Sequence, residues 1–323
     1  MSDSGPRLDE RVCVFGPTLC ATVTIEGTAG GASAVHFHPG GQAFWIARAI
    51  NRLGARSVLV GPIGGESGVV LSSLMSTWDV DLIAARTSDE SAAYVHDRRG
   101  GRRREVASSP GGTLSRHEID DLYGRVIETG AAAGCCVVTG SASGDALGDD
   151  FYRRLGHDLH ALGVVVVADL HGPELDAFVD GGAIDVLKVS HDDLIDDGRL
   201  SEQHDVDARI EVARQLCGRG VSTAVVSDPV GALLVRDSGD IWYAEPPLLE
   251  PVDHRGAGDA MTAALCVSTC RRDDVSTMLR LACAAGAATV TRHGLGNAEA
   301  RVIDSIADSV ALRRLAHSDC APG

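Results

Sequence analysis

Lysine is almost absent from this sequence, and so are several other features that would narrow its class. Lys188 is the one lysine among 29 basic residues, which we attribute to codon bias. The formal net charge of −16 argues against nucleic acid as a partner, because phosphate binding needs clustered cations. No apolar run approaches the roughly 20 residues of a membrane span, and neither end has the pattern of a signal peptide. We therefore expect a cytoplasmic protein with no membrane partner.

Paired metal-binding cysteines are missing as well. The nine cysteines include the adjacent Cys135 and Cys136, and Cys266 and Cys270 separated by three residues. No CxxC pair indicates a zinc or redox centre. We therefore interpret the thiols as reduced and mostly buried, acting as small hydrophobic groups.

The 323 residues are 44% hydrophobic, enough to bury a large core. Short runs rich in β-branched residues alternate with amphipathic segments, and several runs are apolar throughout, as expected of parallel strands covered on both faces. The predicted strands are residues 12–15, 57–60, 135–139, 164–169, 186–189, 223–226 and 232–235. The predicted helices are residues 44–53, 67–77, 116–129, 149–162, 208–219, 259–269 and 275–290. This order indicates an α/β fold with a doubly wound, mainly parallel sheet flanked by helices.

We expect a single domain over residues 11–300, with flexible termini at 1–10 and 315–323. Two segments interrupt its alternation of strands and helices. Residues 21–39 are extended and rich in Gly, Thr and Val, and residues 92–107 hold two short strands around the turn DRRGGRRR. Neither can form a crossover helix, so we assign both to a small separate β-sheet. Since α/β folds bind ligands at the carboxyl edge of the sheet, this small sheet is predicted to be a lid.

The segment HRGAGDAMTAAL, residues 254–265, predicts an anion site. Gly256, Ala257 and Gly258 have almost no side chains, and they precede a helix whose first amides favour a negative charge. Asp259 then places a carboxylate beside that anion hole. In phosphoryl transfer an aspartate there takes the proton of the attacking hydroxyl. An ordinary helix start with an acidic first turn has the same pattern, and the tetrapeptide alone leaves both interpretations open.

From about residue 12 to residue 296 the chain resembles the ribokinase and phosphofructokinase B (pfkB) family of carbohydrate and nucleoside kinases. VDHRGAGDAMTAAL is similar to the family's signature around its catalytic aspartate, and PGGQAFWIARAINRLGARSVLVGPIGGESG to its Gly-Gly segment. Further segments follow the family's order and spacing: REVASSPGGTLS, VVTGSASG, VVVVADLHGPEL, LKVSHDDL, VSDPVGALLV and AAGAATVTRHG. This series of segments is most similar to that of the family branch that phosphorylates hexose phosphates.

The resemblance implies ATP and Mg²⁺ as cofactors, Asp259 as the catalytic base, and Gly256, Ala257 and Gly258 as the anion hole. It also implies a set of nucleotide-binding residues on the later loops and helices, namely Ser190, Ser227, Asp228, Gly231, Arg255, Cys283 and Gly286. Asp193 takes the position that helps order magnesium. Four of these residues depart from the family: Ser190 and Asp193 replace an Asn and a Glu, Asp228 replaces a glycine, and Arg255 replaces a small hydroxyl residue. Arg255 is included because an arginine beside an anion hole can hold a phosphate.

The acceptor side departs further. The family's usual Asp near the end of the first strand is replaced by Ala21 or Thr22, and the Asn after Gly-Gly by Trp45. Trp45 either stacks on an acceptor ring or packs into the core, and the arginine-rich lid turn either meets an anionic substrate or is solvated. The expected acceptor-binding residues are Ala21, Thr22, Gly40, Gly41, Gln42, Trp45 and Arg104.

Together these features predict an ATP-dependent kinase that transfers the γ-phosphate to a hydroxyl of a sugar, a sugar phosphate or a nucleoside-like acceptor. Because the sugar-clamping Asp and Asn are replaced, a ribokinase-fold ligand-binding or regulatory protein with weakened catalysis is the alternative. An exposed lid sheet often needs a partner, so we expect a homodimer formed through the lid.

Overall fold

The computed structural model describes residues 11–28, 30–141, 147–201, 205–252, 255–291 and 298–315. The predicted flexible ends lie outside these ranges, apart from Leu315. Among the helices in these ranges, none combines the length and apolar composition that crossing a membrane requires.

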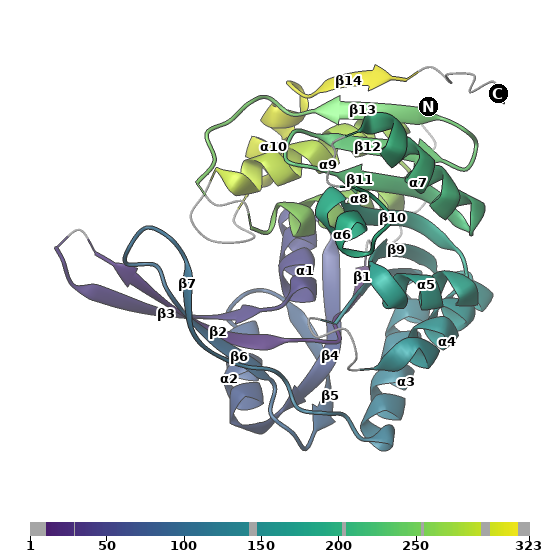
Figure 1. Ribbon diagram of the computed structural model, residues 1–323. Coiled ribbons are helices and arrows are strands. Elements are labelled where there is room, and N and C mark those ends of the chain that lie inside the picture. Colours follow the sequence, from purple (N-terminus) through teal and green to yellow (C-terminus); the bar gives the residue numbers. More distant parts are fainter. Residues whose placement is uncertain are drawn as a thin grey trace, which may run out of the picture.

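A ten-stranded sheet forms the centre of the molecule, in the order β14-β13-β12-β11-β10-β9-β8-β1-β4-β5 (Figure 1). The strands from β11 to β5 in this order are parallel: β1 (Arg11–Phe15), β4 (Arg56–Gly64), β5 (Asp81–Thr87), β8 (Cys135–Thr139), β9 (Val165–Asp169), β10 (Ile184–Ser190) and β11 (Val221–Ser227). Three antiparallel strands extend one edge: β12 (Ala232–Arg236), β13 (Ile241–Glu245) and β14 (Ala311–Arg314). The predicted doubly wound, mainly parallel sheet is confirmed.

Helices cover both faces of this sheet, and a separate hydrophobic cluster fills each layer. One cluster includes α1 (Gln42–Arg52), α2 (Gly65–Met75), α8 (Ala257–Arg271), α9 (Val275–Val290) and α10 (Ala300–Ala307). The other includes α3 (Arg116–Ala133), α4 (Gly148–Ala161), α5 (Gly172–Gly181), α6 (His191–Asp196) and α7 (Val206–Gly218). Because strand side chains alternate, the neighbours Cys135 and Cys136 belong to different clusters.

The seven predicted strands and seven predicted helices are all present, with ends that differ by a few residues. In the large sheet and its helices, the elements outside the predicted ranges are the edge strands β5 and β14, the inner strand β13 and the helices α5, α6 and α10. Edge strands are partly exposed and carry no continuous apolar run. Helix α6 has only six residues, too few for a helical period to show.

The two interrupting segments form a separate four-stranded sheet, the lid, in the order β3-β2-β6-β7. Its strands are β2 (Cys20–Gly27), β3 (Ser33–Gly40), β6 (Ala92–Asp97) and β7 (Arg104–Ser109), and Figure 1 shows them projecting from one side of the large sheet. Thr22, Thr24 and His96 lie on its inner face and are buried. On its outer face Val35 and Phe37 are 53% and 58% exposed.

Three glycines allow the backbones of α4 and α5 to touch. A Cβ at Gly181 would lie 1.9 Å from the backbone oxygen of Arg153, and one at Gly182 would lie 2.3 Å from that of Gly156. A Cβ at Gly156 would in turn lie 2.6 Å from a backbone oxygen of α5. Since backbone atoms cannot move away cheaply, these positions require glycine.

We therefore expect Gly181→Ala to lower the free energy of unfolding by about 1–3 kcal/mol, because the added methyl group overpacks the contact between the helices. Gly124→Ala in α3 is the matched control, since a Cβ there meets nothing within 4 Å. The control should raise stability by about 0.5–1 kcal/mol, because alanine loses less backbone entropy than glycine. Urea unfolding of both variants tests this, and equal stabilities would contradict it.

Candidate active site

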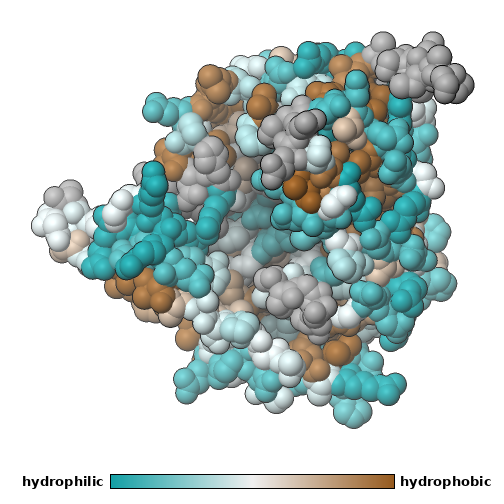
Figure 2. Space-filling model, in the orientation of Figure 1, coloured by the Kyte–Doolittle hydropathy of each residue, from teal (hydrophilic) through white to brown (hydrophobic). Residues whose placement is uncertain are grey.

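A cleft of about 840 Å³ lies between the lid and the carboxyl ends of the parallel strands. Tyr94 of β6 and Glu105 of β7 line it from the lid, and Thr139, Asp169 and Lys188 line it from β8, β9 and β10. Figure 2 shows the surface hollowed between the projecting lid and the body of the molecule. This is the edge at which parallel α/β sheets bind ligands.

Lys188 lies at the base of the cleft among carboxylates. Its Nζ donates to Asp169 Oδ1 at 3.3 Å, and both side chains are almost fully buried. The hydroxyl of Thr262 on α8 donates to the other oxygen of Asp169 at 2.5 Å. Burial alone would lower the pKa of Lys188, but the charges of Asp169, Asp193 and Asp259 outweigh it and raise that pKa. Lys188 is therefore a buried cation.

Asp259 stands on the first turn of α8, close to this pair. Its burial, followed by the negative charge of Asp169, raises the pKa of Asp259 to about 7, and the positive charge of Lys188 offsets only part of this rise. A carboxyl group with a pKa near 7 can both accept and release a proton at neutral pH.

The loop before Asp259 has the backbone of an anion site. Gly256 is the N-cap of α8 and has a left-handed φ of 77°, which favours glycine. A Cβ at Gly258 would lie 2.8 Å from Lys188 Nζ, so a larger residue would push into the ammonium group. The first amides of α8, starting at Ala257, therefore lie close to the ammonium group of Lys188, which lines the cleft, although the described residues that line the cleft include none from α8.

Ser190 and Asp193 form a capping box at the start of α6. Ser190 Oγ accepts from the Asp193 N–H at 3.0 Å, and Asp193 Oδ2 accepts from the Ser190 N–H at 2.9 Å. Both residues also line the cleft. The capping box fixes the Asp193 carboxylate at the end of β10, near Lys188.

The Asp228 side chain holds its loop through hydrogen bonds from the loop's own backbone. Its Oδ1 accepts from the backbone N–H groups of Val230 and Gly231 at 2.7 and 2.8 Å, and its Oδ2 pairs with Arg209. Both side chains of this ion pair are at most 5% exposed. The structure thus gives the Asp228 carboxylate a structural role in the predicted nucleotide loop, in place of direct contact.

The remaining predicted nucleotide residues lie in packing layers. Ser227 is buried at the end of β11, and Cys283 lies on α9 with its Sγ 3.9 Å from the backbone oxygen of Ala244. Gly286 allows α9 to approach α8, because a Cβ there would lie 3.0 Å from Met261 Cγ. Among the described residues that line the cleft, none comes from α9.

On the acceptor side, Gly41 and Gln42 line the cleft at the start of α1. Gly41 has a φ of 101°, and a Cβ there would lie 2.5 Å from a backbone oxygen, so both conformation and space require glycine. Ala21, Thr22 and Gly40 are buried in the lid strands behind this corner and do not reach the cleft wall.

Trp45 packs in the core beneath the lid. It is 5% exposed, and its ring centroid lies 4.8 Å from that of Phe44, 5.7 Å from that of His38 and 5.9 Å from that of Trp78. Trp45 is not among the residues that line the cleft. The structure therefore favours the core alternative over stacking on an acceptor.

Two neighbouring lid arginines, Arg103 and Arg104, lie in different surroundings. Arg104 is exposed and pairs with Asp97 at 3.7 Å, which directs it away from the cleft. Arg103 donates to the ring of His96 and lies 5.6 Å from the ring centre of the cleft residue Tyr94. Burial and then the charges of Arg103 and Arg255 lower the pKa of His96 to about 4. Arg255, beside the anion hole, therefore lies near Arg103.

The model of the pfkB family carbohydrate kinases matches residues 9–301. The chain belongs to the pfkB family. It is accordingly a phosphotransferase with an alcohol group as acceptor, and a kinase of the carbohydrate class.

Curated relatives agree with this assignment. The pfkB-family chain is 27% identical to the ATP-dependent 6-phosphofructokinase isozyme 2 of Escherichia coli K12, over 80% of this chain and 83% of that relative. It is 29% identical to the isozyme 2 of Mycobacterium tuberculosis CDC 1551, over 81% of this chain and 76% of the relative. The structure of phosphofructokinase-2 from Escherichia coli in complex with fructose-6-phosphate superposes with a TM-score of 0.79 at 23% identity, over 94% of this chain and 99% of that one. This superposition supports the fold.

Sequence reasoning missed three residues of this pfkB-family site: Asp169, His171 and Lys188. All three line the cleft. Their common signal was position, because each lies at or near the carboxyl end of a predicted parallel strand. Because Lys188 is the one lysine in the sequence and lies near the end of a predicted parallel strand, its position indicated a site residue, and codon bias was an incomplete explanation.

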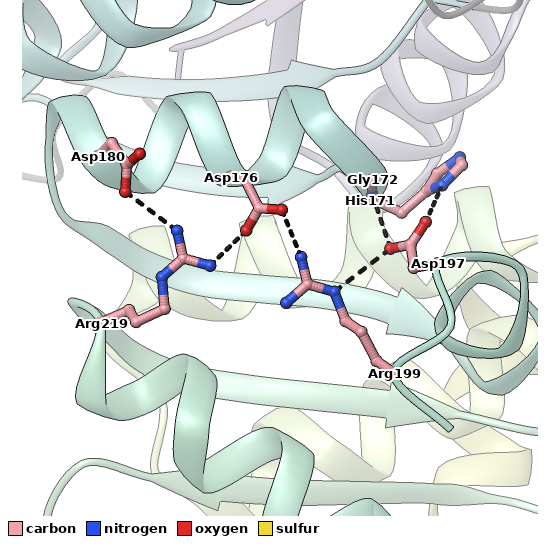
Figure 3. A network of polar contacts seen from close by, with 7 residues as sticks. All are labelled: His171, Gly172, Asp176, Asp180, Asp197, Arg199 and Arg219. Carbon is pink, nitrogen blue, oxygen red and sulfur yellow. Dashed lines mark hydrogen bonds and ion pairs between the residues drawn. The ribbon is translucent and has the colours of Figure 1, made fainter. Parts of the chain in front are cut away.

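His171 is held at the cleft by a network of ion pairs (Figure 3). Asp197 accepts from the Gly172 N–H at 2.7 Å and from His171 Nδ1 at 3.2 Å. Arg199 lies 3.6 Å from Asp197 and donates to Asp176 at 2.7 Å. The chain of pairs continues to Arg219 and Asp180. The network thereby fastens the N-terminal end of α5 to the segment after α6.

We expect Asp259→Asn to stabilise the protein at pH 8, because the amide avoids the cost of a buried charge. The pKa of Asp259 rises from 3.8 to about 7 on folding, so the folded state binds this proton more tightly than the unfolded state. The free-energy cost of holding the ionised Asp259 in the folded protein therefore grows above pH 3.8 and reaches its full size above about pH 7.

Chemical denaturation at pH 4 and at pH 8 measures this effect. The difference in the free energy of unfolding between the Asp259→Asn variant and the parent protein should be larger at pH 8 than at pH 4 by on the order of a few kcal/mol. Asp192→Asn, which changes an exposed acid in α6, is the control and should show no such pH-dependent gain. A gain for Asp259→Asn that is equal at both pH values would contradict the raised pKa.

Proposed function

We propose that the protein is an ATP-dependent sugar-phosphate kinase in which Asp259 is the general base. The observation that carries this proposal is the arrangement of Asp259, with its pKa near 7, beside the buried cation Lys188 and the first amides of α8. A base, a positive charge and an anion hole lie together there, next to the part of the cleft wall that Lys188 forms. These are the groups that phosphoryl transfer needs.

In the proposed step, the acceptor hydroxyl gives its proton to Asp259 while its oxygen forms a bond to the γ-phosphorus. The bond from that phosphorus to the bridging oxygen of ADP breaks, and ADP leaves with the electron pair. The amides after Gly256 and the ammonium group of Lys188 stabilise the charge on the transferred group. The lid covers the cleft and limits the access of water to the phosphorus.

The residues fit both cofactors. Gly258 leaves room that a Cβ would fill, and the loop of Asp228 and Gly231 is held rigid, as an ATP phosphate site requires. Asp193 offers a fixed carboxylate oxygen, the ligand type that Mg²⁺ prefers, directly or through water. When bound, magnesium neutralises charge on the nucleotide phosphates. We assign Asp193 to the metal. We assign Ser190, Arg255 and the loop from Ser227 to Gly231 to the nucleotide.

A phosphorylated sugar is the acceptor that the lid favours. Burial lowers the pKa of Arg103, and the positive charge of nearby Arg255 lowers it further. An anion between the lid and the α8 loop would relieve this repulsion. The names of the relatives, phosphofructokinases, point to the same class of acceptor. Cleft residues Gly41 and Gln42 then contact the sugar.

Acceptor-dependent release of ADP tests the reaction. Fructose 6-phosphate and fructose 1-phosphate should be turned over at least about 10-fold more efficiently than fructose, ribose or adenosine, because only a phosphate forms charge-assisted hydrogen bonds. Asp259→Asn should lower kcat by about 10² to 10⁴ while ATP affinity is kept. Absence of turnover with every acceptor would favour the ligand-binding alternative. Near-normal turnover by the variant would remove Asp259 from the mechanism.

A matched pair of variants tests the phosphate contact. Arg103→Ala should raise KM for the sugar phosphate about 10-fold or more, because it removes a charged donor. Arg104→Ala, at the next position and directed toward Asp97, should leave KM nearly unchanged. The KM for ATP is the internal control in both. Equal effects of the two substitutions on the acceptor KM would contradict the assignment.

We further propose that the lid mediates a homodimer. Its outer face carries Val23, Ile25, Val35 and Phe37, which pair across β2 and β3. Figure 2 shows apolar surface along this projection. Because exposed apolar area on a sheet favours a partner, a second copy is expected there. Sedimentation of the chain as a monomer at micromolar concentration would contradict this.

A further inference from the structure

Three cysteine side chains converge at the end of the sheet opposite the cleft. Cys135 is the first residue of β8, whereas Cys266 and Cys270 lie one turn apart near the C-terminal end of α8. Their Sγ atoms all lie within 4.8 Å of one another, and those of Cys135 and Cys266 are 3.8 Å apart. Cys135 and Cys266 are buried, and Cys270 is half-buried. The group is therefore closed on the core side and reachable past Cys270.

The spacing of these sulfurs matches that of a metal-thiolate site. Zinc–sulfur bonds of about 2.3 Å place the sulfurs of a tetrahedral or trigonal ion about 3.8 to 4.0 Å apart. The pair Cys135 and Cys266 already has this separation. A change in the side-chain torsion of half-buried Cys270 would bring the third sulfur to the same distance, because the cluster spans at most 4.8 Å.

Burial alone does not explain this arrangement. The buried thiols of Cys13 and Cys136 also contact each other, but among the described residues no third thiol joins that pair, and Cys283 is a single small group in its packing layer. Here three thiols come from two separate elements, and Cys270 reaches the edge of the core, where any small residue would pack as well. Among the described residues, no fourth His, Cys, Asp or Glu joins the group. A bound ion would therefore keep one position for water or a small ligand.

We propose that Cys135, Cys266 and Cys270 form a three-thiolate site for a thiophilic d¹⁰ metal ion of the Zn²⁺ and Cd²⁺ class. Binding replaces the three thiol protons by three metal–sulfur bonds, and the protons pass to solvent. The ion joins the start of β8 to the end of the helix whose first turn bears Asp259. The site is structural and distinct from the magnesium position at the cleft.

Titration of the reduced, metal-free protein with Cd²⁺ tests the site through the ultraviolet charge-transfer absorption of cadmium thiolates. The chain should bind one equivalent of Cd²⁺, and Zn²⁺ should displace it with loss of the absorption. The bound ion should also raise the melting temperature by on the order of 5 °C, because it binds only the folded state. Elemental analysis after gel filtration measures the stoichiometry.

Cys270→Ser should abolish this equivalent and the thermal shift. Its matched control is Cys217→Ser, a half-buried cysteine on α7 outside the group, which should retain both. All titrations are made in a Cys320→Ser background, so that this remaining thiol does not contribute. Binding of less than about 0.1 equivalent by the parent protein at about 10 µM free Cd²⁺ would overturn the proposal, because metal–thiolate sites bind more tightly than this. Retention of the full equivalent by Cys270→Ser would overturn it too.

Discussion

The ion pair of Lys188 and Asp169, with Asp259 beside it, is the interaction on which the rest of the site depends. Isolated, each of these charges would be expensive in the interior, and each is tolerable because the others are present. Burial raises the pKa of Asp259, and the second carboxylate on the same ammonium group, Asp169, raises it further. The same electrostatic arrangement thus neutralises a buried cation and prepares a base that works at neutral pH.

The doubly wound sheet explains why these groups meet. Asp169 and Lys188 come from neighbouring parallel strands, so their side chains reach the same edge although 18 residues separate them in sequence. Asp259 comes from a helix whose N-terminus begins at that edge, and Thr262 on the next turn fastens α8 to Asp169. The lid then adds arginine and aromatic groups from segments that are not part of the sheet. Fold and electrostatics are therefore inseparable in this site.

The sequence predicted the fold well because long periodic segments carry their own signal. Several predicted central strands are apolar throughout, and each predicted long helix is present. The short or edge elements, such as α6 and β14, were missed because six or four residues hold no periodic pattern. For the site, GAGD could be recognised locally. The role of Lys188 could not, because it depends on the carboxylates of two other elements.

Two alternatives on the substrate side stayed open in the sequence for a different reason, namely that they depend on orientation. Arg103 and Arg104 are adjacent in sequence, yet Arg103, just before β7, lies near Tyr94, whereas Arg104, its first residue, pairs with Asp97. Trp45 follows the Gly-Gly turn, as an acceptor residue would, yet the direction of α1 turns its ring toward Phe44 and Trp78. A single rotation of a helix or strand reverses such an assignment.

The single lysine has a practical consequence for chemistry on this protein. Reagents that acylate primary amines have two targets in the whole chain, the terminal α-amino group and Lys188. Lys188 is buried and strongly protonated, so it reacts slowly, and the chain can be attached to a surface or dye through its N-terminus alone. Every molecule would then present its cleft in the same orientation. A protease specific for lysine has one site in the chain, and that site lies at the base of the cleft.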